Sequence, residues 1–258
     1  MLPVLRFLLV AAACTLAALP ALAFDGKTLR IASEGARPPF NFLDGDGKLT
    51  GFEIELGREL CKRLAVDCAF VAVEFDGLIP GLVSNHFDAI MAAMEISDER
   101  RAEIDFSKPY VRMPSAFMAA RKRQIHDSSP EGQAGRSIGV EANGPHQAWL
   151  EERYKASIIK PFASLEDAVL DLAEGRLDLT LGDKDAVMNY LASHKEAQCC
   201  KYLADAPRDP AYFGDGIGIG LRKEDGALKD RFDAALDAAV ADGTYATIRA
   251  KYFAFEIY

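Results

Sequence analysis

Several short stretches carry residue types that could do chemistry, but each lacks a part that its motif requires. Residues 26–28 end like a phosphate-binding loop, yet the glycine needed five positions earlier is Ala21. Residues 44–48 begin like a calcium-binding loop and then place a lysine at a ligand position, so they indicate a hairpin turn. The alternating glycines of 214–220 miss the dinucleotide-binding spacing and suit a strand that lies close to another backbone. The sequence thus contains no recognisable catalytic constellation, and we expect neither a metal nor another cofactor.

The first 23 residues form a segment that is separate from the fold. One charge, Arg6, precedes an apolar run over residues 7–19, and Pro20 and an Ala-Leu-Ala sequence follow. This order predicts a secretory signal peptide that is cleaved after Ala23. The apolar run is shorter than the ~20 residues that a membrane-spanning helix needs. The mature chain is therefore expected to be exported to an oxidising compartment.

Cleavage of the signal peptide removes Cys14 and leaves four cysteines in the mature chain. An even number of cysteines in an oxidising compartment indicates disulfides. Cys61 lies late in a predicted helix and Cys68 opens the next predicted strand. A bridge between them would therefore staple a helix-to-strand turn. The neighbours Cys199 and Cys200 cannot form an ordinary bridge with each other without strain, and free thiols are an equal alternative.

Strand and helix patterns alternate along the mature chain, which predicts an α/β fold with mainly parallel sheets. An amphipathic helix is expected over 51–64, where apolar residues recur on one face. The other expected helices are 78–83, 98–103, 147–154, 165–174, 185–192 and 230–252, the last broken near Gly243. The expected strands are 29–33, 68–73, 88–94, 114–120, 137–140, 158–162, 177–181 and 216–221.

The strand–helix pattern occurs twice, and extended, proline-containing segments at 106–115 and 207–215 would connect the two blocks. Two crossings mean that one lobe is inserted into the other. We therefore predict lobe 1 over 24–113 and 214–258 and lobe 2 over 114–213. Two lobes joined by extended strands suit hinge closure around a ligand. A net charge of −9 without a basic run argues against nucleic acid as a partner.

One set of segments carries a family resemblance along essentially the whole mature chain. These segments lie at 51–64, 75–82, 87–91, 104–107, 175–178, 220–225 and 242–253. They resemble the polar amino-acid family (family 3) of periplasmic solute-binding proteins, most of all its lysine/arginine/ornithine and histidine binders, which share a cysteine pair at the Cys61 and Cys68 positions. The resemblance implies a periplasmic monomer that catalyses nothing and delivers a small molecule to an inner-membrane ABC permease.

The resemblance also assigns three residues of a ligand site. Arg100 matches the arginine that holds the ligand α-carboxylate, a contact that suits a planar guanidinium group. Asp183 matches the aspartate that receives the α-ammonium group. Phe75 matches the aromatic residue that lies under the ligand side chain.

Other site positions depart from the family pattern. Ala92, Ala93 and Glu95 stand where hydroxyl residues usually help to hold the carboxylate. The acidic position near the first strand is Glu34, and Arg37 replaces the aromatic residue that usually follows it. Glu141 and His146 occupy the loop of the second lobe that normally helps to bind the carboxylate.

The charges of these residues predict the ligand class. Four acidic side chains against two arginines leave the expected cleft at about −2, which favours a cationic ligand. A basic or polar amino acid, or a derivative such as an opine, is the predicted ligand. A carboxylate-free amine, histamine-like or guanidino-like, is the main alternative, and pairing of Glu95 with Arg100 in the closed form would favour it.

Two further classes remain as alternatives. Some proteins with this fold are cyclohexadienyl dehydratases, which need a general acid in the cleft, and Glu95 or Glu141 could serve as one. Nothing else in the sequence supports that activity. A receptor sensor domain is the other alternative, but the chain shows no membrane helix or signalling domain before it ends at Tyr258, so a freestanding protein is expected.

Overall fold

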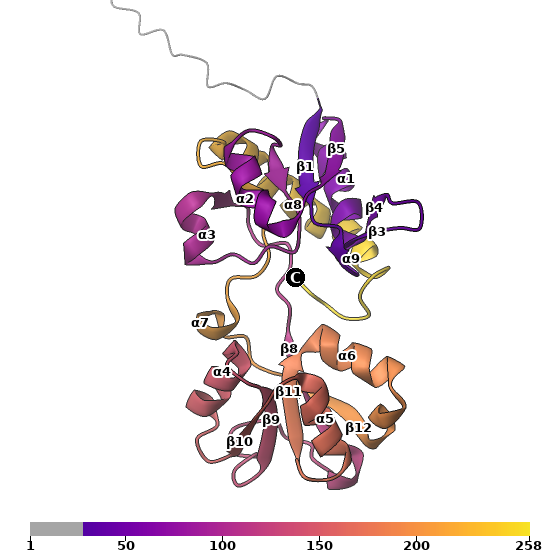
Figure 1. The fold of residues 1–258 in the computed structure, drawn as a ribbon, viewed down its shortest axis with the longest axis vertical. Coiled ribbons are helices and arrows are strands. Elements are labelled where there is room, and N and C mark those ends of the chain that lie inside the picture. The colour runs from indigo at the N-terminus through magenta and orange to yellow at the C-terminus, as the bar shows by residue number, and fades with distance from the viewer. Residues whose placement is uncertain (1–27) are drawn as a thin grey trace, which may run out of the picture.

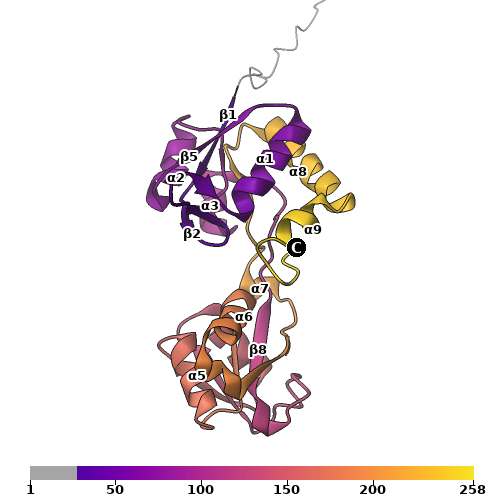
Figure 2. The same ribbon diagram turned by 90° about the vertical axis from the view of Figure 1, so that its right-hand side faces the viewer.

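The computed structural model describes residues 28–258, which form two α/β lobes joined by extended segments (Figures 1 and 2). The signal peptide predicted over residues 1–23 lies outside the described residues, as do residues 24–27, the predicted start of lobe 1. Each lobe has a five-stranded sheet of its own, and the predicted two-lobe α/β architecture is confirmed. No helix within 28–258 is long and apolar enough to cross a bilayer.

The sheet of lobe 1 has the strand order β5-β1-β6-β13-β7. Its strands are β1 (Leu29–Ser33), β5 (Cys68–Ala72), β6 (Ala89–Ile90), β7 (Asp105–Phe106) and β13 (Gly220–Leu221). Its helices are α1 (Phe52–Leu64), α2 (Phe75–Val83), α3 (Asp98–Glu103), α8 (Gly226–Ala241) and α9 (Thr244–Arg249). A separate small sheet joins β2 (Ala36–Arg37), β3 (Asn41–Leu43) and β4 (Leu49–Thr50).

The sheet of lobe 2 has the strand order β10-β9-β11-β8-β12. Its strands are β8 (Ser115–Ala120), β9 (Ser137–Glu141), β10 (Ile158–Phe162), β11 (Leu179–Asp183) and β12 (Cys200–Asp205). Its α-helices are α4 (Pro145–Arg153), α5 (Leu165–Ala173), α6 (Lys184–Ser193) and α7 (Pro210–Phe213), with 3₁₀ turns at Arg121–Arg123 and Lys195–Cys199. The predicted lobe boundaries after residues 113 and 213 stay a prediction.

One strand in each sheet runs against the other four. In lobe 1 it is β13, which pairs antiparallel with β6 and β7, and in lobe 2 it is β8, which pairs antiparallel with β11 and β12. Each of these strands follows a crossing from the other lobe. Such a strand enters its sheet at the edge that faces the other lobe, whereas the parallel strands end there. The predicted mainly parallel sheets therefore hold for four of five strands in each lobe.

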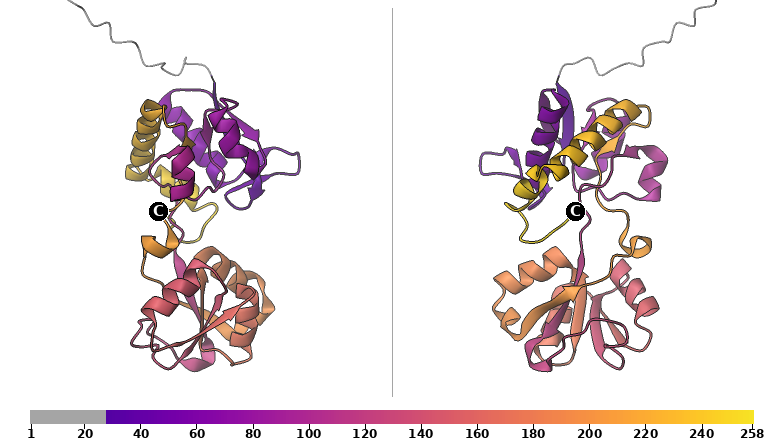
Figure 3. Two further views of the ribbon diagram at one scale, coloured as in Figure 1. Left: turned by 60° about the vertical axis from the view of Figure 1, so that its left-hand side comes forward. Right: turned by 180° about the vertical axis from the view of Figure 1, so that it is seen from behind.

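Helices cover both faces of each sheet (Figure 3). The side chains of β8, which point alternately to the two faces of the lobe 2 sheet, show why both faces need a covering helix. Ala116, Met118 and Ala120 pack into one buried cluster with α5 and α6, while Phe117 and Ala119 pack into another with α4. Successive residues of a strand point to opposite faces, so an all-apolar strand is buried on both sides.

Three elements differ from their sequence predictions near the cleft, and one of them is the predicted strand 216–221, which is reduced to β13. The predicted strand 88–94 is reduced to β6, because the chain leaves the sheet after Ile90 and Ala93 adopts a left-handed backbone with φ +49°. Helix α2 begins at Phe75, three residues earlier than predicted. Helix α1 begins as expected, after Gly51, whose φ of +118° and close approach to the Phe40 carbonyl leave no room for a side chain.

The structure confirms the disulfide between Cys61 and Cys68, whose Cα atoms lie 6.2 Å apart. It also joins Cys199 to Cys200, for which the sequence left free thiols as an equal alternative. The first bridge connects the last turn of α1 to the start of β5, as the spacing predicts. The second lies where a 3₁₀ turn meets β12.

Replacing both Cys61 and Cys68 by alanine is expected to lower the free energy of unfolding by about 2–3 kcal/mol, because the unfolded chain regains the freedom of a short loop. Equilibrium unfolding in urea measures this loss. The Cys199→Ala/Cys200→Ala variant is the control, since its bridge closes no loop of intervening residues. Equal losses in the two variants would contradict the loop argument.

Candidate ligand-binding site

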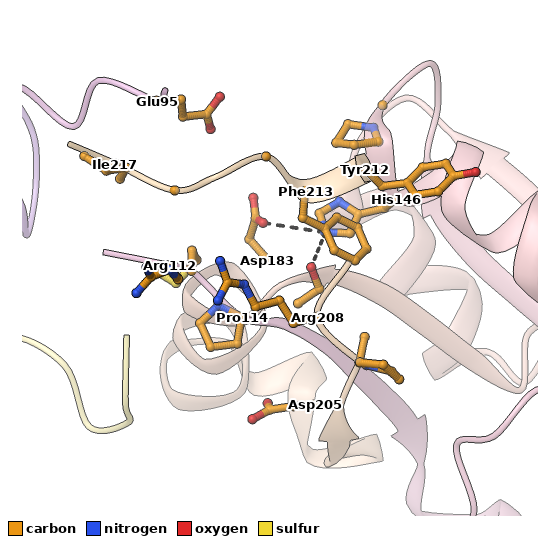
Figure 4. Close-up of a pocket in the computed structure, with 18 of the residues that line it drawn as sticks. Glu95, Arg112, Pro114, His146, Asp183, Asp205, Arg208, Tyr212, Phe213 and Ile217 are labelled. Carbon is orange, nitrogen blue, oxygen red and sulfur yellow. Dashed lines mark hydrogen bonds and ion pairs between the residues drawn. The ribbon is translucent and has the colours of Figure 1, made fainter. Parts of the chain in front are cut away.

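A cavity of about 690 Å³ lies between the two lobes (Figure 4). Lobe 1 contributes Glu95 and Ile217 to its wall, and lobe 2 contributes Glu141, His146 and Asp183. The volume falls within the roughly 300–1,000 Å³ that is usual for small-molecule sites. Of the ten sequence-predicted ligand residues, Glu95, Glu141, His146 and Asp183 share this cavity.

The sheets bring these polar side chains to the cleft. Asp183 is the last residue of β11 and Glu141 is the last residue of β9, and these strands are parallel neighbours. Glu95 follows β6 of lobe 1 after the turn at Ala93. The carboxyl ends of parallel strands are the usual place for ligand sites in open α/β sheets. The buried strands thus fix the positions of carboxylates that come from both lobes.

His146 lines the cavity on the lobe 2 side. Its Nε2 atom is 2.8 Å from Ser115 Oγ and 3.6 Å from Asp183 Oδ1 (Figure 4). The ring also packs against Phe213, with the ring centroids 5.2 Å apart. Burial lowers the pKa of His146 to about 4, so the imidazole is neutral at neutral pH. His146 therefore positions its neighbours but does not neutralise Asp183.

Asp183 holds its proton more tightly than an ordinary aspartate. Desolvation, followed by the negative charges of Asp185, Glu95 and Glu141, raises its pKa to about 6. Although 59% of the side chain is exposed, it faces the cavity, where protein atoms surround much of the space. The charges of Glu95 on lobe 1 and Glu141 on lobe 2 both act on this carboxylate. A bound cation would relieve that repulsion.

Arg100 and Phe75 form a second cluster, on lobe 1. The Arg100 guanidinium carbon lies 5.5 Å from the centroid of the Phe75 ring, and its Nη1 donates to the backbone oxygen of Glu95 at 2.7 Å. Ser97 Oγ begins helix α3 by accepting from the Arg100 N–H. Within the described residues the Glu95 carboxylate forms no ion pair, with Arg100 or otherwise. Phe75 borders a smaller cavity of about 270 Å³ beside Met94.

The remaining predicted residues lie on lobe 1 outside the large cavity. Ala92 and Ala93 are buried and offer no hydroxyl group. Glu34 directly follows β1 and is half-buried, and Arg37 is exposed in β2. The structure thus brings four of the predicted residues together between the lobes, and it places Arg100 and Phe75 together in the second cluster. The other four predicted residues line neither cavity.

A buried carboxylate behind the site escaped the sequence analysis. Glu53 Oε1 accepts from the Ala93 N–H at 2.7 Å and from the Tyr110 hydroxyl, and its Oε2 accepts from Asn41 Nδ2 at 2.6 Å. Asn41 Oδ1 in turn accepts from the Gly35 N–H at 2.7 Å. Burial raises the pKa of Glu53, and the three donors oppose that rise. The sequence did indicate that Glu53 is buried, because position 53 falls on the same helical face as the buried apolar positions 56, 60 and 64.

Two cavity arginines were also missed. Arg112 lies on the first crossing and Arg208 on the return crossing, and both line the large cavity. The proline-containing, extended sequence of these segments indicated only a hinge. Groups of His, Cys, Asp or Glu that could hold a metal ion do not occur within residues 28–258.

Two α/β lobes, two crossings and an acidic cleft between them define the class of two-lobe binding proteins. The chain belongs to the bacterial extracellular solute-binding proteins, family 3, whose family model matches residues 29–255. It is 36% identical to the lysine/arginine/ornithine-binding periplasmic protein of Escherichia coli, over 96% of this chain and 93% of that protein. It is 34% identical to the L-arginine-binding protein of Pseudomonas aeruginosa, over 97% of each.

Solved structures identify the conformation. A Silicibacter pomeroyi binding protein of the His/Glu/Gln/Arg/opine family in complex with lysine is 33% identical, with a TM-score of 0.55 over 89% of this chain and 99% of that one. The unliganded, open L-cystine receptor of Neisseria gonorrhoeae is only 26% identical, yet its TM-score is 0.75 over 90% and 95%. The higher score despite lower identity indicates that the lobes stand apart here, as in an open binding protein.

Proposed function

We propose that this protein is the periplasmic component of an ABC importer and that it binds a cationic amino acid of the arginine or lysine type, or a derivative of one, by closing its lobes. One observation carries the proposal. Carboxylates from both lobes, Glu95 on one and Glu141 and Asp183 on the other, face a single cavity, and none pairs with a lysine or arginine of the described chain. The relatives named for arginine and for lysine/arginine/ornithine support the same ligand class.

Lobe closure completes the site in this proposal. Arg100 and Phe75 lie on lobe 1 outside the large cavity in the open form, whereas Asp183 lines that cavity on lobe 2. Closure would bring the carboxylate-binding arginine and the ammonium-binding aspartate to the two charged groups on the α-carbon of one ligand. Without a cation, closure would also bring Glu95 toward Asp183 and Glu141, and like charges disfavour that approach.

The partner in this proposal is an inner-membrane ABC permease, to which a monomer delivers its ligand after cleavage of the signal peptide behind Ala23. No catalytic step is assigned to the cleft. The two relatives described above are both named as binding proteins, which supports a role in transport.

A carboxylate-free amine is the second candidate, and one observation favours it. Ala92 and Ala93 are buried without hydroxyl groups, and the Ala93 N–H is already bonded to Glu53, so these residues offer a ligand carboxylate little on lobe 1. The geometry of Arg100 favours the amino acid instead, since its guanidinium group bonds the Glu95 carbonyl and leaves the carboxylate of Glu95 unpaired.

Replacing Glu95 by serine decides between these candidates. We expect the change to weaken the binding of arginine, lysine and agmatine alike by about tenfold, because an unpaired carboxylate at the cavity wall should contact the ligand cation. Isothermal titration calorimetry with the three ligands measures it, and Glu99→Ser, an exposed residue of the adjacent helix α3, is the control. Stronger binding of arginine but not of agmatine would mean that Glu95 competes for Arg100, and would favour the amine. Failure of the wild-type protein to bind arginine, lysine or a derivative of either would refute the proposed function.

A further inference from the structure

The segment after α9 runs along lobe 1 to the hinge between the lobes (Figures 1 and 2). Phe253 packs edge-on against Phe52 of α1, with the ring centroids 5.6 Å apart. Ile257 is fully buried in the core of lobe 1, and its backbone oxygen accepts from the Arg112 N–H at 2.6 Å. These two anchors fix residues 253–257, which we call the strap, to lobe 1 and to the first crossing.

Between its anchors, the strap contacts lobe 2. The Phe255 ring lies over the ammonium group of Lys184, the first residue of α6, with Nζ 5.0 Å from the ring centroid. On lobe 2 the same ammonium group pairs with Asp205 at 2.8 Å and lies 5.2 Å from the centroid of the Tyr202 ring. Only 12% of the Lys184 side chain is exposed. A cation is attracted to an aromatic face, most strongly where little water surrounds it, so Phe255 holds the two lobes together at this point.

The strap contact lies on the far side of the hinge from the ligand carboxylates of lobe 2. Strand β8 comes directly from the first crossing and separates β9 and β11 from β12 in the sheet. Glu141 and Asp183 end β9 and β11, whereas Asp205, the partner of Lys184, ends β12. In the view of Figure 4, Pro114, which leads into β8, lies between Asp183 and Asp205, and the cavity extends around it to Asp205. Closure of a cleft on one side of a hinge moves groups on the opposite side apart.

We propose that the strap stabilises the open form through Phe255 and Lys184, and that closure around a ligand must break this contact. The proposal rests on the lobe closure of the proposed function and goes beyond it, because neither residue lines the ligand cavity. Whatever stabilises the open form weakens the binding of a ligand that requires the closed form. The strap therefore lowers the affinity for every ligand by one common factor without contacting any of them.

Isothermal titration calorimetry of the Phe255→Ala variant tests the strap. We expect arginine and lysine each to bind this variant about three- to fivefold more tightly than the wild-type protein, with the same factor for both. Adding Phe255→Ala to Lys184→Met should bring no further gain, because the contact is already lost. Tyr202→Ala is the matched control, since it removes the other ring from the same ammonium group but within lobe 2. It should change either affinity by less than about twofold.

The outcomes separate this inference from the proposed function. If arginine binds the wild-type protein and binds Phe255→Ala no more tightly, or if Tyr202→Ala brings an equal gain, the strap is refuted while the proposed function stands. Single-molecule energy transfer between dyes on the two lobes needs no ligand, and it should show a closed fraction about three to five times larger in Phe255→Ala. If the wild-type protein binds no cationic amino acid or derivative, the proposed function fails, and an unchanged closed fraction would then refute the strap as well. Phe255→Leu keeps the apolar contact with lobe 1 without the ring, and it replaces Phe255→Ala if thermal unfolding shows that the alanine variant has lost its fold.

Discussion

Replacing Asp183 by asparagine is expected to lower the affinity for arginine by about 100-fold, the largest loss that we predict for a single conservative change. Truncating one partner of a desolvated charge pair costs about 2–5 kcal/mol, and about 1.4 kcal/mol corresponds to a tenfold change in affinity. Asparagine keeps the shape of the side chain and one acceptor oxygen, so the loss measures the charge. Calorimetry at pH 7.5 measures it.

Asp185→Asn is the matched control. Asp185 lies two residues further along, in the first turn of α6, and is not part of the cavity wall. Its removal takes away one of the charges that raise the pKa of Asp183, so affinity for arginine should change little and the pKa of Asp183 should fall. Equal losses in the two variants would mean that only the overall charge of the lobe matters.

The raised pKa of Asp183 also predicts how binding depends on pH. The carboxylate is ionised above about pH 6 and protonated below it, while arginine stays cationic throughout. Affinity should therefore be constant above about pH 7 and should fall toward about tenfold per pH unit below pH 6. The Asp183→Asn variant should lack this dependence. A flat profile for the wild-type protein between pH 5 and 7 would contradict the assignment of Asp183 to the ligand cation.

The same pKa predicts that the variant folds well. Because the pKa of Asp183 is higher in the folded chain than its ordinary value, the ionised carboxylate destabilises the open protein, and this cost disappears as the pH falls from about 6 toward 4. Asp183 is the N-cap residue of α6, but its side chain makes no capping hydrogen bond. Asp183→Asn should therefore unfold at a temperature no lower than the wild-type protein at pH 7.5.

The acidic cleft could be predicted because its residues follow local rules. Glu141 and Asp183 come at the ends of short apolar strands, and parallel strands end at the same edge of a sheet. The predicted helix at 98–103 matches α3 in both bounds, since Ser97 caps it and a charged run follows. Each of these features depends on neighbours within a few residues along the chain.

The missed features depend on contacts that are distant in sequence. The Glu53 carboxylate meets Ala93 and Tyr110 from 40 and 57 residues away. Arg112 lines the cavity because the second crossing and the C-terminal segment pass beside it. The early end of β6 likewise follows from the left-handed turn at Ala93, which the apolar run 88–94 conceals. Patterns of apolar residues report burial, and they do not report which buried polar group finds which partner.

Glu53→Gln is expected to destabilise the fold by about 2–3 kcal/mol, because it turns Oε2 into a donor that faces the Asn41 amide donor. The Oε1 acceptor for Ala93 and Tyr110 remains. Asn41 cannot rotate to compensate, since its own oxygen already accepts from the Gly35 N–H. Urea unfolding measures the loss, and affinity for arginine should fall as well, because Glu53 holds the left-handed turn that leads to Glu95.

Adding Asn41→Asp to Glu53→Gln should restore the stability that Glu53→Gln alone removes. In the Glu53→Gln/Asn41→Asp variant, the glutamine amide donates to a carboxylate that still accepts from the Gly35 N–H, so the direction of one hydrogen bond is reversed and the net charge is unchanged. Asn41→Asp alone should be the least stable of the three, since it sets two buried carboxylates against each other. The double variant should therefore be more stable than either single variant and should regain most of the arginine affinity. Simple additivity of the two single losses would show that Glu53 and Asn41 do not act as a pair. Recovery of stability without recovery of affinity would show that the network supports the fold of lobe 1 but does not position the ligand site.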